Sequence, residues 1–69
     1  MKDNHENDLR IQQELARRRG DHHNELAITL QLARYFITNK YDKGATLAQL
    51  KYAEDLVERL KPDTPTKPN

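Results

Sequence analysis

The segment from residue 22 to residue 39 carries apolar residues at two sets of positions that only an α-helix brings onto common faces. One set has the i, i+4, i+7, i+11 spacing of a helical stripe, and the other lies on a different side of the same helix. The first stripe consists of Leu26, Leu30, Ala33 and Ile37, and the second of Ile28, Leu32, Tyr35 and Phe36. A helix with two apolar faces has to be covered from two sides. We therefore predict an all-α protein with a central helix over 22–39.

A helix is also predicted before the central one, over residues 4–19. Asp3 and Glu6 have the spacing of a capping box, and Gly20 tolerates the left-handed conformation that ends many helices. Asp21 can then cap the central helix. Apolar residues are sparse in the first helix, at Leu9, Ile11, Leu15 and Ala16. The pattern leaves open whether this helix completes a small three-helix bundle or lies peripherally on a helical hairpin.

A third helix is predicted over residues 47–60. The connection over 39–45 contains Asn, Asp and Gly, which favour turns, and Thr46 with Gln49 has the spacing of a second capping box. The apolar stripe of this helix is Leu47, Leu50, Ala53, Leu56, Val57 and Leu60. The last eight residues, PDTPTKPN, hold all three prolines and cannot continue it. We expect a single helical domain over 1–61 and a disordered proline-rich tail over 62–69.

The small size of the chain points to a partner. It has 69 residues and no cysteine, and about a fifth of its residues are Leu, Ile, Val or Phe, so its own core is thin. A partner protein or a second copy that covers apolar surface adds to the stability of such a fold. We therefore expect a protein-binding module, either a homodimer or an adaptor, inhibitor or accessory regulator that docks onto a larger protein.

The aromatic residues indicate where such an interface lies. Tyrosine is among the residue types that contribute most to binding at protein interfaces. The aromatic residues group near the end of the central helix and in the third helix. The predicted interface residues are Tyr35, Phe36, Tyr41, Tyr52 and Leu56. For Phe36 and Tyr52 an ordinary core position is the alternative interpretation.

Three consecutive arginines close the predicted first helix, at Arg17, Arg18 and Arg19. At a helix C-terminus they complement the macrodipole, and they can also contact phosphate groups. The alternative function is thus a small nucleic-acid-binding regulator of helix-turn-helix type. Charge weakens this alternative, because the net charge is only +1 and the exposed side of the third helix is acidic where base-reading residues are expected.

No catalytic constellation is visible in the sequence. The chain has no cysteine, no serine and no glycine-rich phosphate loop. His5 with Asp8 and His22 with Glu25 each place an imidazole and a carboxylate one helical turn apart, which makes at most half of a metal site. We predict a protein that is not an enzyme and binds neither a cofactor nor a metal.

Nothing in the sequence directs the chain to a membrane or out of the cell. Its first residues, MKDNHENDLR, contain no apolar run of signal-peptide length. No window approaches the roughly 18 apolar residues that a membrane span requires. We therefore expect a cytoplasmic protein that does not bind membranes.

Overall fold

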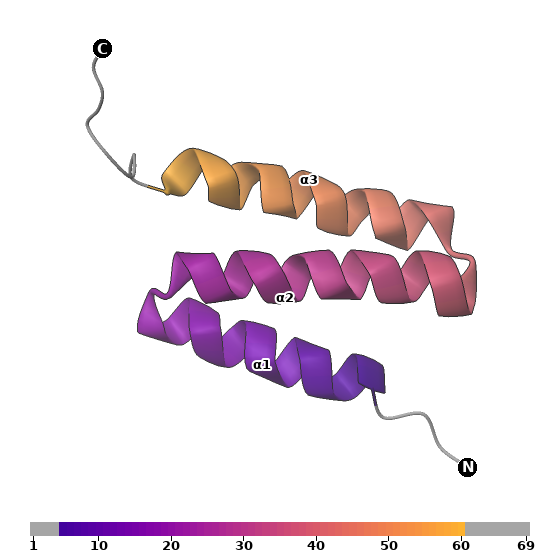
Figure 1. Ribbon diagram of the computed structural model, residues 1–69, viewed down its shortest axis with the longest axis horizontal. Coiled ribbons are helices and arrows are strands. Elements are labelled where there is room, and N and C mark those ends of the chain that lie inside the picture. The colour runs from indigo at the N-terminus through magenta and orange to yellow at the C-terminus, as the bar shows by residue number, and fades with distance from the viewer. Residues whose placement is uncertain (1–4, 61–69) are drawn as a thin grey trace.

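The computed structural model describes residues 5–60, which form three α-helices and one π-helical segment (Figure 1). In chain order these are α1 (His5–Arg19), α2 (His22–Tyr35), the π-helix η1 (Phe36–Lys40) and α3 (Lys43–Arg59). The predicted all-α fold of three helices is confirmed. The predicted proline-rich tail over 62–69 and the predicted cap Asp3 lie outside the described residues.

Helix α2 lies between the other two helices, which run antiparallel to it (Figure 1). It packs against both of them, whereas no Cα atom of α1 comes within 8 Å of one in α3 over residues 5–60. The second predicted stripe of α2 is buried, together with Leu9 and Ala16 of α1. Ala53 and Leu56 are the buried residues of α3. The predicted central position of α2 is confirmed, and α1 packs on α2 and on Phe36 of η1 but not on α3.

The turn between α1 and α2 has the capping chemistry that the sequence predicts. Gly20 adopts a φ of +70°, and the Asp21 amide donates a hydrogen bond of 3.0 Å to the Ala16 carbonyl. The Asp21 carboxylate accepts a hydrogen bond from the Asn24 amide at 3.3 Å. Glycine at the left-handed position and aspartate at the N-cap thus reverse the chain within two residues.

Gly20→Ala is expected to lower the free energy of unfolding by about 1–2 kcal/mol, because the left-handed conformation is costly for a residue with a Cβ atom. Gly44→Ala is the matched control. Gly44 lies in the first turn of α3, and a Cβ there would have Asp42 Oδ1 at 3.7 Å as its nearest neighbour, an ordinary contact. That substitution is expected to raise stability by about 0.4–1 kcal/mol. Urea unfolding followed by circular dichroism measures both, and equal losses in the two variants would contradict the role given to Gly20.

Helix α3 begins earlier than the sequence predicts. Its N-cap is Asp42, whose carboxylate accepts a hydrogen bond from the Ala45 amide at 3.0 Å. The predicted cap Thr46 already lies inside the helix and donates its hydroxyl to the Asp42 carbonyl at 2.8 Å. The prediction of a start at Thr46 is wrong because Asp42, a good cap four residues upstream, adds about one full turn of backbone hydrogen bonds, which outweighs the low helix propensity of Gly44.

The end of the central helix also differs from the prediction, because the α-helix stops at Tyr35 and continues as the π-helix η1. The Phe36 carbonyl accepts hydrogen bonds from the Tyr41 and Asp42 amides, which closes this segment. Tyr41 has a φ of +51°, a left-handed conformation that is uncommon for residues other than glycine. The wider turn lets the chain reverse over Tyr41 and enter α3 directly at its cap.

Candidate functional site

Most of the predicted interface residues belong to the core of this fold. Tyr35, Phe36 and Leu56 are buried, and the rings of Tyr35 and Phe36 pack edge to face with centroids 5.8 Å apart. The face of Phe36 is also covered by the Arg10 guanidinium, 5.6 Å from the ring centroid. The side chains of Tyr35, Phe36 and Leu56 thus stabilise the fold of the chain itself. Tyr41, at 83% exposure, is the predicted interface residue that lies open to solvent.

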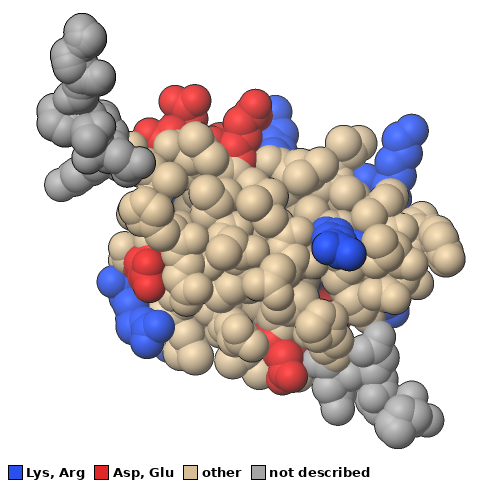
Figure 2. Space-filling view, in the orientation of Figure 1, with Lys and Arg blue, Asp and Glu red and all other residues tan. Residues whose placement is uncertain are grey.

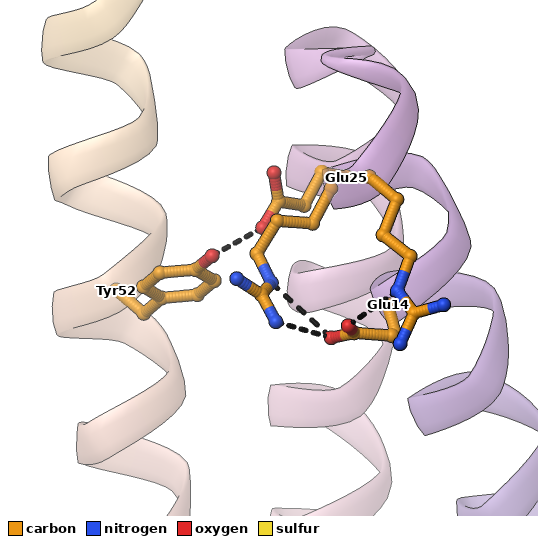
Figure 3. Close-up of polar contacts among 5 residues, drawn as sticks. Glu14, Glu25 and Tyr52 are labelled. Atoms are coloured by element: carbon orange, nitrogen blue, oxygen red, sulfur yellow. Dashed lines mark hydrogen bonds and ion pairs between the residues drawn. The ribbon is translucent and has the colours of Figure 1, made fainter.

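Tyr52 takes part in a polar cluster between α2 and α3. Its hydroxyl donates a hydrogen bond to Oε2 of Glu25, a carboxylate that is only 1% exposed (Figure 3). His22 lies on the other side, with Nδ1 at 3.9 Å from Glu25 Oε1. Burial and the hydrogen bond to Glu25 raise the pKa of Tyr52 above its ordinary value. The buried acid is thus satisfied by a neutral hydroxyl of the neighbouring helix.

The cluster continues to α1 through Thr29. The Thr29 hydroxyl donates to the Glu25 carbonyl at 2.8 Å and accepts a hydrogen bond from Gln13 Nε2 at 2.7 Å. Side chains of α1, α2 and α3 are therefore connected through two adjacent turns of α2. Buried polar groups need such partners, because an unsatisfied one costs free energy. No sequence pattern indicates this cluster, since Glu25 and Thr29 are polar residues of the kind found on the surface of a helix.

The arginine cluster at the end of α1 is engaged with an acid on the same helix. Arg17 Nη2 lies 2.6 Å from Glu14 Oε1, and Arg18 Nε lies 2.9 Å from Glu14 Oε2 (Figure 3). The hydrogen bonds from Arg17 and then Arg18 hold the pKa of the Glu14 carboxyl below its ordinary value. All three arginines are exposed. A phosphate that approached Arg17 and Arg18 would have to compete with the carboxylate already bound between them.

The two histidine pairs do not build a metal site. In the part of the chain that the structure describes, no three His, Cys, Asp or Glu side chains come together to hold a metal ion. His22 and Glu25 do lie close to each other, as their spacing predicts, but the Glu25 carboxylate already accepts a hydrogen bond from the Tyr52 hydroxyl. The ring of His5 packs instead against Tyr35, with centroids 5.4 Å apart.

A groove between α2 and α3 is lined by none of the five predicted interface residues. It has a volume of about 510 Å³, and we call it the α2–α3 groove. It is lined by Leu26, Leu30, Leu47, Leu50, Lys51, Ala53, Glu54 and Val57. Four of its aliphatic side chains are between 43% and 56% exposed, namely Leu30, Leu47, Leu50 and Val57. The sequence places these residues in helical stripes, and within residues 5–60 no other helix covers them.

One face of the molecule has few charged side chains in its middle. Figure 2 shows a broad area without Lys, Arg, Asp or Glu over the middle of the helical row, with charged residues mostly toward its edges. Depletion of charged residues at the centre is a feature of surfaces that bind other proteins.

The fold and the groove together define a small protein of three helices with an uncovered apolar surface between two of them. Comparison with protein families, curated proteins and solved structures finds no match to the chain. Within residues 5–60 no helix has the length and apolar character needed to cross a bilayer. Function is therefore inferred from the site itself, since a fold alone does not define one.

Proposed function

We propose that this chain is a non-enzymatic, cytoplasmic docking module that binds another protein through the α2–α3 groove, as an adaptor, an inhibitor or an accessory regulator. The observation that carries the proposal is the exposure of four large aliphatic side chains, from two helices, in one groove. Full burial of one such side chain gains about 1.5–3 kcal/mol. A partner that covers the groove therefore obtains most of its binding energy from these residues.

The chemistry of the groove fits a partner that presents an apolar helical surface. An amphipathic helix that lays its apolar side into a groove between two helices is a common mode of protein recognition. The groove has two charged residues at its wall, Lys51 and Glu54, of opposite sign. It therefore has no excess of positive charge for nucleic acid. The pairing of Arg17 and Arg18 with Glu14 likewise favours protein binding over the nucleic-acid alternative.

A matched pair of substitutions tests the proposal. Leu50→Glu places a charge in the groove, whereas Ile11→Glu places the same charge at a similarly exposed position on α1. Ile11 follows the buried Leu9 by two residues, which places it about 200° away around the helix axis and so on the exposed side of α1. Proteins captured from cell extract by the tagged chain are quantified by mass spectrometry. We expect specific capture to fall at least about tenfold with Leu50→Glu, which corresponds to the loss of one buried leucine, and to persist with Ile11→Glu.

Circular dichroism has to show that both variants are as helical as the wild-type chain. If folded Leu50→Glu captures the same proteins in the same amounts as the wild type, the α2–α3 groove is not the docking surface. The proposal then fails.

A further inference from the structure

We propose that the occupant of the α2–α3 groove is the same groove of a second copy, so that two α2–α3 hairpins form a symmetric four-helix bundle with α1 on the outside. This inference rests on the proposed function, because it names the partner for the same surface. It follows from the spacing of the groove residues, from the arrangement of the helices and from the two charges in the groove.

The spacing of the groove residues is that of a coiled-coil seam. On α3 the positions 47, 50, 54 and 57 follow one another at intervals of three, four and three residues, which are the a and d positions of a heptad. On α2 the groove residues Leu26 and Leu30 are four residues apart, and intervals of three and four continue this row to Ala33, which is buried, and to Ile37, which is exposed on η1. Two adjacent seams with this period match the helix packing of four-helix bundles, in which helices cross at about 20°.

The arrangement of the helices explains why another layer is needed. Domains are generally built from two packed layers of secondary structure, with the apolar residues between them. Here α1 and α3 contact α2 from its two sides and do not approach each other, so within residues 5–60 nothing lies over the groove. A second copy offers a groove of the same length and the same heptad spacing. A two-fold axis would bring the two grooves face to face, which is the commonest symmetry of soluble oligomers.

The charges in the groove favour a second copy over an unrelated helix. Glu54 occupies an a position of the seam and Lys51 lies one turn before it on the same wall. Neither side chain forms an ion pair with another residue of the described part of the chain. Across a two-fold axis that passes between residues 52 and 53 and runs antiparallel copies of α3 past each other, Lys51 of each copy would face Glu54 of the other. The surface is thus complementary to itself in charge as well as in shape, and the net charge of +1 adds little repulsion between copies.

Charge reversal tests this arrangement without removing apolar surface. The full-length wild-type chain is expected to sediment at equilibrium as a dimer. Glu54→Lys and Lys51→Glu, each alone, place like charges opposite one another and are expected to weaken dimerisation at least about tenfold. An equimolar mixture of the two variants restores two opposite-charge pairs and is expected to form a one-to-one heterodimer. Asp55→Lys reverses a charge on the exposed side of α3, outside the groove, and is expected to leave the dimer intact.

Each contrary result has a distinct meaning. A wild-type chain that stays monomeric at its highest soluble concentration overturns the second copy as occupant. The proposed function survives that result if Leu50→Glu still reduces the capture of proteins from cell extract while Ile11→Glu does not. If neither substitution reduces capture, the proposed function fails as well. A dimer that tolerates both charge reversals, or a mixture of the two variants that stays monomeric, overturns the two-fold pairing of the grooves.

Discussion

Leu32→Ala is expected to leave much of the chain unfolded in the absence of denaturant. Leu32 is 0% exposed and lies in the last turn of α2, in the cluster that joins α1 to α2. Truncation of a buried leucine to alanine costs about 2–5 kcal/mol, because the lost burial is added to the cost of a cavity. A single core of this size rarely supplies more than about 3–5 kcal/mol of stability. The loss is therefore comparable with the whole stability of the fold.

Leu15→Ala is the matched control for this prediction. It is the same change at a leucine that is 51% exposed on α1 and does not line the α2–α3 groove. We expect a loss within about 0.5 kcal/mol, as is usual for surface positions. Far-ultraviolet circular dichroism and urea unfolding measure both variants. A Leu32→Ala chain with a cooperative transition close to that of the wild type would show that this cluster is not the centre of the core.

Tyr52→Phe is expected to lower the free energy of unfolding by about 1.5–3 kcal/mol, because it leaves the buried Glu25 carboxylate without its hydroxyl donor. The ring is retained, so the change removes the hydrogen bond and almost no packing. Tyr41→Phe is the control, since its side chain is 83% exposed, and a change of less than about 0.5 kcal/mol is expected. Equal effects of the two substitutions in urea unfolding would contradict the role given to the Tyr52 hydroxyl.

The same tyrosine gives the stability of the fold a dependence on alkaline pH. The pKa of Tyr52 is raised by burial and then by the hydrogen bond to Glu25, so the folded chain holds the hydroxyl proton more tightly than the unfolded chain. Its contribution is fully present below the ordinary tyrosine pKa of about 10 and is lost as the pH rises through the folded value. Stability of the wild type should therefore fall across this range more steeply than that of Tyr52→Phe. Parallel curves of unfolding free energy against pH would contradict the assignment.

The helices themselves were largely predictable from the sequence. Gly20 and Asp21 mark a helix end and a helix start by their own chemistry, and both act as predicted. The two stripes of the central helix also identify it as the middle element, because apolar residues on two sides require two neighbours. The start of α3 was missed because Asp42 and Thr46 both offer caps, and only the whole helix determines which one is used.

The candidate site was much less accessible to sequence reasoning. Leu50 and Leu56 belong to one predicted stripe, yet Leu56 is buried while Leu50 is 43% exposed in the groove. The difference depends on where the neighbouring helix lies, which helical periodicity does not specify. Tyr35 and Phe36 were predicted at an interface because of their residue type, but the same large apolar area makes aromatic residues the strongest core-forming side chains. Glu25 is predicted only as a partner of His22, and its hydrogen bond with Tyr52 is not predicted because Tyr52 is 27 residues away in the chain.

The position of α2 between two helices that do not approach each other has a consequence for how the chain folds. Within residues 5–60, the helices whose Cα atoms come within 8 Å of one another are neighbours along the chain, α1 with α2, α2 with η1, and α2 or η1 with α3. Loops of only a few residues close both pairs, so contact order is low and little entropy is lost before the first contacts form. Proteins with such local topology fold within roughly microseconds to milliseconds. The chain can therefore close its two hairpins in either order, with α2 as the element common to both.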